Sequence, residues 1–161
     1  MKKRVIIIAI VLGIIICVFL FIRFFDTGKV VSSGNNQEVE VVPLPQEERE
    51  KVAQTLLSSE FIKDIPKEYP VALSFFSFEE NKKVWRDSFL IGKNALLSEG
   101  NPAVYLSLNS KYISEFNGNN LCDVIKTANK NKDLGFYSDY NELNLFIKYA
   151  GMLKHRECFG F

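Results

Sequence analysis

Histidine is almost absent from this chain, which has a single one, His155. This scarcity excludes a histidine-rich metal site and every motif that needs two histidines. His155 and Cys158 together offer half of a zinc site or a Cys–His nucleophile pair, but no second pair accompanies them. The simpler interpretation of His155, beside Lys154 and Arg156, is a cationic group at a helix C-terminus, where it suits the helix dipole. We expect no metal and no cofactor.

Catalytic signatures are missing as well. No run of glycines stands between a predicted strand and a helix, so no phosphate-binding loop is predicted. No pair of carboxylates is singled out by its spacing. From residue 46 onward, 15 lysines and arginines balance 16 aspartates and glutamates, which leaves a net charge near −1 and no basic field for nucleic acid. The sequence therefore predicts a protein that is not an enzyme and has no nucleic-acid partner.

A long run without charge is the most informative feature that is present. It begins at Val5, ends at Ile22 and is almost entirely apolar. As a helix, these residues would span about 27 Å, close to the thickness of the bilayer's hydrocarbon core. A cleaved signal peptide is the alternative, but its apolar core is shorter and ends near small residues, whereas Phe24 and Phe25 follow here. We expect residues 1–25 to be an uncleaved, single-pass transmembrane anchor.

The charges that flank this run suggest an orientation. Lys2, Lys3 and Arg4 precede it, and Arg23 and Lys29 follow it. Positive charges favour the cytoplasmic side, and a short tail with three cations is hard to translocate. We therefore expect the N-terminus in the cytoplasm and the rest of the protein outside the cell membrane.

Two segments follow the predicted anchor. Residues 26–45 are rich in glycine, serine and asparagine and then in proline, which is typical of a linker. Residues 46–161, roughly 115 in number, suffice for one hydrophobic core and are too few for two domains. We expect them to form one soluble domain.

The predicted secondary structure indicates an α+β domain. The expected elements are a helix over 46–63, strands over 71–78 and 84–91, a connection over 94–102 with a helical turn at 95–97, a strand over 103–108, helices over 110–116 and 121–129, a strand over 134–137 and a helix over 140–153. Asn120 is the expected cap of one helix, and Asp139 with Glu142 the capping box of the last. Strands do not alternate regularly with long helices, which favours an antiparallel or mixed sheet of about four to five strands with helices on one side.

Aromatic residues dominate the predicted core. The chain has 14 phenylalanines, which form either an ordinary core or the lining of an apolar cavity. Alternation in the second strand places Trp85, Phe89 and Ile91 on one face, with Asp87 among them. Asp87 is then either a polar group aimed into a pocket, or a residue that lies at a rim or pairs with a nearby lysine or backbone group.

Cysteines are few, with one in the predicted anchor and two, Cys122 and Cys158, in the domain. Outside the cytoplasm a disulfide between these two is chemically permitted. It would close a loop of about 36 residues and stabilise the fold by roughly 4 kcal/mol. Free, buried cysteines are the alternative.

The second half of the domain resembles a known family. The stretches AVYLSLNSKYISEF and LCDVIKTANKNKDLGFYSDYNELNLFIKYAGML, with the preceding hairpin, are similar in rhythm to sterol-carrier-protein-like lipid-binding domains. Ala128 and residues 132–134 fall where that family often turns into its last strand, and Lys148 and Leu153 fall in its closing helix. Over residues 71–153, this resemblance implies an α+β fold with an apolar tunnel between sheet and helices that holds a lipid or acyl chain.

Two functions are consistent with these patterns. The first is a membrane-anchored, non-enzymatic domain that binds a lipid or another apolar ligand. The expected pocket residues are Phe75, Phe89, Leu106, Phe136 and Phe146. The second is a tethered protein-interaction or structural domain of the cell envelope, with a solid core and no ligand, that binds an envelope protein through an exposed face or the C-terminal CFGF tail.

Overall fold

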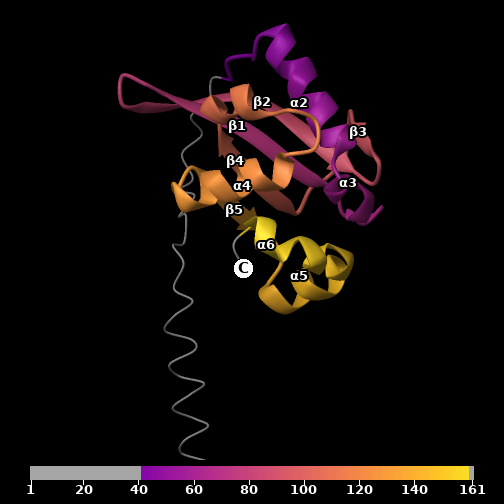
Figure 1. Cartoon of the computed structure of the whole chain (residues 1–161). Helices are drawn as coiled ribbons and strands as arrows, with labels where there is room; N and C mark the ends of the chain where they lie inside the picture. The colour runs from indigo at the N-terminus through magenta and orange to yellow at the C-terminus, as the bar shows by residue number, and fades with distance from the viewer. Residues whose placement is uncertain (1–40, 160–161) are drawn as a thin grey trace, which may run out of the picture. The chain divides into compact units, whose positions relative to one another are not determined.

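A computed structural model describes residues 41–159 and shows one mixed β-sheet with helices (Figure 1). The sheet has five strands in the order β3-β2-β1-β4-β5. Their bounds are β1 Val71–Glu79, β2 Lys82–Gly92, β3 Ala95–Leu97, β4 Val104–Asn109 and β5 Leu134–Ser138. Strand β1 is antiparallel to β2 and parallel to β4, and the other two pairs are antiparallel. The prediction of a small α+β domain with an antiparallel or mixed sheet is confirmed, and the sheet is the mixed kind.

Seven helical segments accompany the sheet in the described part of the chain. They are α2 Gln46–Ser58, α3 Phe61–Asp64, η1 Ser110–Glu115, α4 Leu121–Lys130, α5 Glu142–Lys148, η2 Ala150–His155 and α6 Arg156–Phe159. No helix among residues 41–159 is long and apolar enough to cross a membrane. The predicted anchor at residues 5–22 lies outside the described residues.

Several predicted element boundaries are wrong. The first helix ends at Ser58 because the next residue, Ser59, has an extended backbone conformation. The backbone N–H of Ser59 donates to Leu56 O. The last helix is short and gives way to a 3₁₀ turn after Lys148. Residues 95–97 form strand β3 rather than a helical turn, because a two-residue turn pairs them with the end of β2.

Two predicted helix caps also differ. Asn120 makes no capping bond to α4. Its side chain accepts from Asn117 N and donates to Glu115 O, which closes the preceding loop instead. The cap of α5 is Asn141, whose Oδ1 accepts from Asn144 N at 2.9 Å, rather than Asp139.

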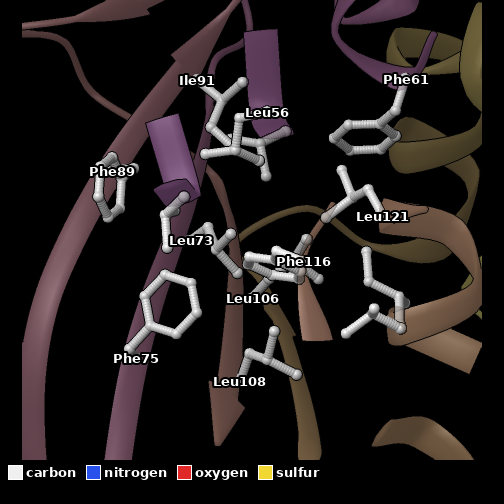
Figure 2. Packing of buried hydrophobic residues seen from close by; sticks show 14 of the residues in the cluster. Leu56, Phe61, Leu73, Phe75, Phe89, Ile91, Leu106, Leu108, Phe116 and Leu121 are labelled. Carbon is white, nitrogen blue, oxygen red and sulfur yellow. The ribbon is translucent and has the colours of Figure 1, made fainter. Parts of the chain in front are cut away.

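The hydrophobic core lies between one face of the sheet and helices α2, η1 and α4. Because side chains alternate along strands, the inward residues of β1, β2 and β4 share one face. They are Val71, Leu73, Phe75, Phe89, Ile91, Val104, Leu106 and Leu108. Figure 2 shows several of them beside Leu56 of α2, Phe116 and Leu121 of α4. Phe75 meets Phe89 and Phe116 edge to face, at centroid distances of 6.0 and 6.4 Å.

A bulge in β2 overturns the predicted side-chain alternation. The register shifts between Ser74, which pairs with Ser88, and Phe76, which pairs with Trp85. The extra residue in β2 turns Trp85 to the face opposite Phe89, because paired residues share a face. Trp85 therefore contacts Phe76, at a centroid distance of 6.1 Å, on the side away from the core.

The segment before α2 runs along the free edge of β2. Val41 forms a parallel bridge with Trp85, and Val42 N donates to Trp85 O at 2.9 Å. Asp87 Oδ2 then accepts from Leu44 N at 3.1 Å and pairs with Arg49 at 2.8 Å. Asp87 is thus a partner for a backbone group and a cation, the second of the two interpretations above. Leu44, inside the predicted linker, belongs to the core.

Gly135 of β5 provides a test of the sheet's outer face. A Cβ there would collide with Ser107 Oγ, but would lie 3.7 Å from Ser107 Cβ, which is ordinary contact. We expect Gly135→Ala to reduce the free energy of unfolding by about 1 kcal/mol, because the Ser107 hydroxyl has to rotate away from the new methyl group. Adding Ser107→Ala should recover most of that loss, whereas independent sites would give additive effects. Urea unfolding of the full chain in mild detergent, followed by tryptophan emission, measures both.

Candidate functional site

A disulfide joins Cys122 in α4 to Cys158 in α6, with their Cα atoms 4.9 Å apart. It fixes the C-terminal segment against α4. Asn129 adds to this by donating from Nδ2 to Phe159 O at 3.0 Å. The start of the CFGF tail is therefore packed into the domain. Phe159 also lies against Phe61 of α3, with ring centroids 5.4 Å apart.

A cleft of about 390 Å³ lies beside this disulfide, between the end of α2, the α2–α3 junction, α4 and α6. Its apolar lining consists of Phe61, Leu121, Ile125, Phe159 and the two cysteines. Its polar lining consists of Ser58, Ser59, Glu60, Asn119 and His155. The break in helix at Ser59 and the bridge to Cys158 create this concavity, because they bring the ends of three helices together.

His155 is held at the rim of the cleft by Asp64 of α3. Its Nε2 lies 2.7 Å from Asp64 Oδ2, and Lys154 Nζ lies 2.8 Å from the same oxygen. The hydrogen bond from Lys154, followed by that from His155, holds the pKa of the Asp64 carboxyl below its usual value. Similarly, the hydrogen bond and charge of Lys63 lower the pKa of Glu60. Both carboxylates near the cleft are therefore ionised at neutral pH and offset by cations.

The two serine hydroxyl groups in the cleft donate hydrogen bonds to backbone carbonyl oxygens. Ser58 Oγ donates to Gln54 O at 2.7 Å, and Ser59 Oγ donates to Leu56 O at 2.9 Å. Neither hydroxyl is hydrogen-bonded to His155. Both cysteine sulfurs are in the disulfide, and residues 41–159 contain no cluster of three metal-ligating side chains. The arrangement offers apolar contact and hydrogen bonds to a guest molecule.

The Asp64 contacts lead to a pH-dependent prediction. Because the pKa of Asp64 is lowered in the folded protein, its stabilisation is complete above the ordinary value of 3.8 and is lost as pH falls through the folded value. We expect Asp64→Asn to cost about 1–2 kcal/mol at neutral pH, as for loss of hydrogen bonds to a charged group. Unfolding curves of the variant and the parent chain should converge below that pH. The control is Glu99→Gln on an exposed loop, whose unfolding curve should coincide with that of the parent chain at neutral as well as at low pH.

The five predicted pocket residues fall into two groups, three in the core and two on more exposed elements. Phe75, Phe89 and Leu106 lie in the packed core (Figure 2). Phe136 of β5 is 40% exposed, and Phe146 of α5 is 58% exposed. None of the five lines the cleft. The cysteines were the only sequence signal that pointed toward it, because a bridge between them must bring α4 and the C-terminal segment together.

A second surface feature is an apolar ridge on α5, formed by Leu143, Phe146 and Ile147. These side chains are 58–70% exposed, although each is large and apolar. The opposite side of α5 is fixed to the domain. Lys148 Nζ lies 3.9 Å from the centroid of the Tyr69 ring, and buried Tyr149, just after the helix, contacts the same ring. The ridge is therefore presented on a fixed support.

Comparisons with known proteins add no relative. No protein-family model matches this chain, and no curated protein or solved structure shows significant similarity to it.

Proposed function

We propose that this protein is a membrane-anchored, non-enzymatic domain that binds a lipid or another apolar ligand in the cleft beside the disulfide. The cleft itself is the observation that carries the proposal. Its volume lies within the range of about 300–1,000 Å³ that is usual for small-molecule sites, and its lining combines aromatic and aliphatic walls with a few polar groups. This differs in place from the tunnel between sheet and helices that the resemblance implies.

The charges around the cleft suggest the chemistry of the ligand. Glu60 is offset by Lys63, and Asp64 by Lys154. The described residues that line the cleft include no lysine or arginine, so the lining does not favour a highly charged anionic headgroup. His155 and Asn119 supply hydrogen-bonding groups at the rim. An acyl chain that ends in a small polar group fits this arrangement, with the chain against Phe61, Leu121 and Phe159.

Photolabelling tests this site directly. The full chain in nanodiscs would be exposed to palmitic acid that carries a diazirine, and the labelled peptides would be mapped. We expect label on residues 119–125 and 155–159. Ser58→Phe, which adds a ring at an exposed position of the lining, should reduce this label, whereas Gln54→Phe, one helical turn earlier, should not. Label confined to residues 1–25 would contradict a ligand site in the cleft.

The ridge on α5 favours a second function, recognition of an envelope protein. Leu143, Phe146 and Ile147 have the i, i+3, i+4 spacing by which an amphipathic helix inserts into an apolar groove. Exposed apolar patches of this kind are uncommon unless they serve as contact sites. The partner that fits is a protein with a hydrophobic groove, and the ridge supplies the inserted helix.

In-cell crosslinking separates this function from the first. A photoreactive phenylalanine analogue at position 143 should give one discrete adduct with a protein, and the same analogue at position 99 should not. Phe146→Ser should remove the adduct without loss of expression. Crosslinks from position 143 to lipid alone would contradict recognition of a protein by this ridge.

A further inference from the structure

An aromatic cluster occupies the tip of the β1–β2 hairpin, on the face of the sheet away from the core. Phe76, Phe78 and Trp85 form this hairpin cluster. Phe76 lies 5.6 Å from Phe78 and 6.1 Å from Trp85, both edge to face. Phe78 is 61% exposed. The hairpin extends beyond the body of the domain in Figure 1, and the strand register places the cluster in its outer part, close to the turn that follows Glu79.

One lysine lies flat on this cluster. Lys83 Nζ is 4.1 Å from the centroid of Phe76 and 4.0 Å from that of Trp85. Its desolvation among the rings lowers its pKa. The ammonium group of Lys83 is therefore held on the ring faces in a cation–π contact. Aromatic rings with a lysine beside them are typical of the boundary between lipid tails and headgroups.

Val41, the first residue after the predicted anchor that the structure describes, lies at the hairpin cluster. Val41 pairs with Trp85, and Val42 N donates to Trp85 O, so residue 41 is fixed to the cluster. Residues 23–40 separate it from the apolar run that ends at Ile22. Whatever its conformation, a segment of this length cannot exceed about 65 Å. Among the described surfaces, the hairpin cluster is therefore next to the point where the segment from the predicted anchor joins the domain.

We propose that the hairpin cluster rests in the headgroup region of the bilayer, with Phe78 and Trp85 inserted among the lipids. This inference rests on the proposed membrane anchor and is independent of the cleft. Glu79 pairs with Lys82 in the strand register and accepts from Arg86 Nη2, and Glu80 follows. The tip therefore carries no strong net charge, and the contact is hydrophobic. It should form on zwitterionic lipid and persist in high salt.

The chain offers a built-in reporter, because Trp85 is its only tryptophan. The full chain would be reconstituted in phosphatidylcholine vesicles, with and without bromine atoms on the acyl chains. We expect Trp85 emission to be weaker in the brominated vesicles than in the unbrominated ones. We also expect it at a shorter wavelength than in nanodiscs whose small lipid area leaves the hairpin in water. Phe78→Ser should weaken the quenching. Leu143→Ser, on the α5 ridge, is the matched control and should leave it unchanged.

Three outcomes would overturn the inference, and a carbonate wash tells the first two apart. If the chain stays in the vesicles after the wash while Trp85 is equally bright in both lipids, the anchor holds and the hairpin contact is wrong. If the wash releases the chain, the proposed anchor fails and the inference fails with it. Quenching that disappears in Leu143→Ser but survives in Phe78→Ser would also contradict it, since the bilayer would then contact the α5 ridge.

Discussion

Replacement of both Cys122 and Cys158 by serine should lower the free energy of unfolding by about 4 kcal/mol. The bridge spans a sequence separation of 36 residues, and in the chain-entropy account its removal restores that much conformational freedom to the unfolded chain. This is a large fraction of the total stability of a domain of this size. Urea unfolding of the full chain in mild detergent, followed by Trp85 emission, measures the change.

The cleft should be lost together with this stability. Helix α6 is only four residues long, and the disulfide is its covalent link to α4. Without it, Phe159 keeps its noncovalent contacts, among them those with Phe61 and Asn129, and these have to overcome the conformational freedom of a short helix. We expect photolabelling of residues 155–159 to fall sharply in the double variant, even at temperatures where the sheet remains folded.

The third cysteine supplies the matched control. Cys17→Ser leaves the disulfide in place and should change neither the unfolding curve nor the labelling. A double variant as stable as the parent chain would show that the bridge does not constrain the domain. The redox state also bears on the proposed location, because disulfides persist mainly outside the cytoplasm. Two alkylatable cysteines, in addition to Cys17, in protein freshly isolated from cells would contradict the proposed topology.

The sequence predicted the sheet well because its strands carry strong local signals. Residues 71–78 and 84–91 are rich in aromatic and β-branched residues and flank a polar turn, and both form strands. The inward residues of α4, with Leu121, Val124 and Ile125, were equally evident from helical spacing. Where the period of hydrophobic residues was clear, the predicted element exists.

The errors arise where one residue decides the geometry. A single extra residue in β2 turns Trp85 away from the core, and hydrophobic alternation alone cannot reveal such a bulge. The break at Ser59 divides what reads as one helix. The cleft depends on that break and on the disulfide, so no local pattern could have placed its lining. Phe146 fits an apolar helix face by spacing, yet that face points outward.

Comparison of Phe75→Ala with Phe146→Ala tests whether the space between sheet and helices is solid. Phe75 is fully buried and packs on Phe89 and Phe116. Truncation of a phenylalanine in a close-packed core typically costs about 3–5 kcal/mol, since it removes buried apolar surface and leaves a cavity. We expect Phe75→Ala to fall in this range in the same unfolding experiment.

Phe146→Ala should behave in the opposite way. Its ring is mostly exposed, so we expect a change in unfolding free energy within about 0.5 kcal/mol. A tunnel beneath the sheet, as the resemblance implies, would make Phe75 part of a wall, and its truncation would then cost much less and enlarge the ligand space. A loss below about 1.5 kcal/mol in Phe75→Ala, together with added photolabel on residues 71–78, would therefore indicate a ligand site in the core and not in the cleft. The reason is that removal of a well-packed phenylalanine ring costs more than this.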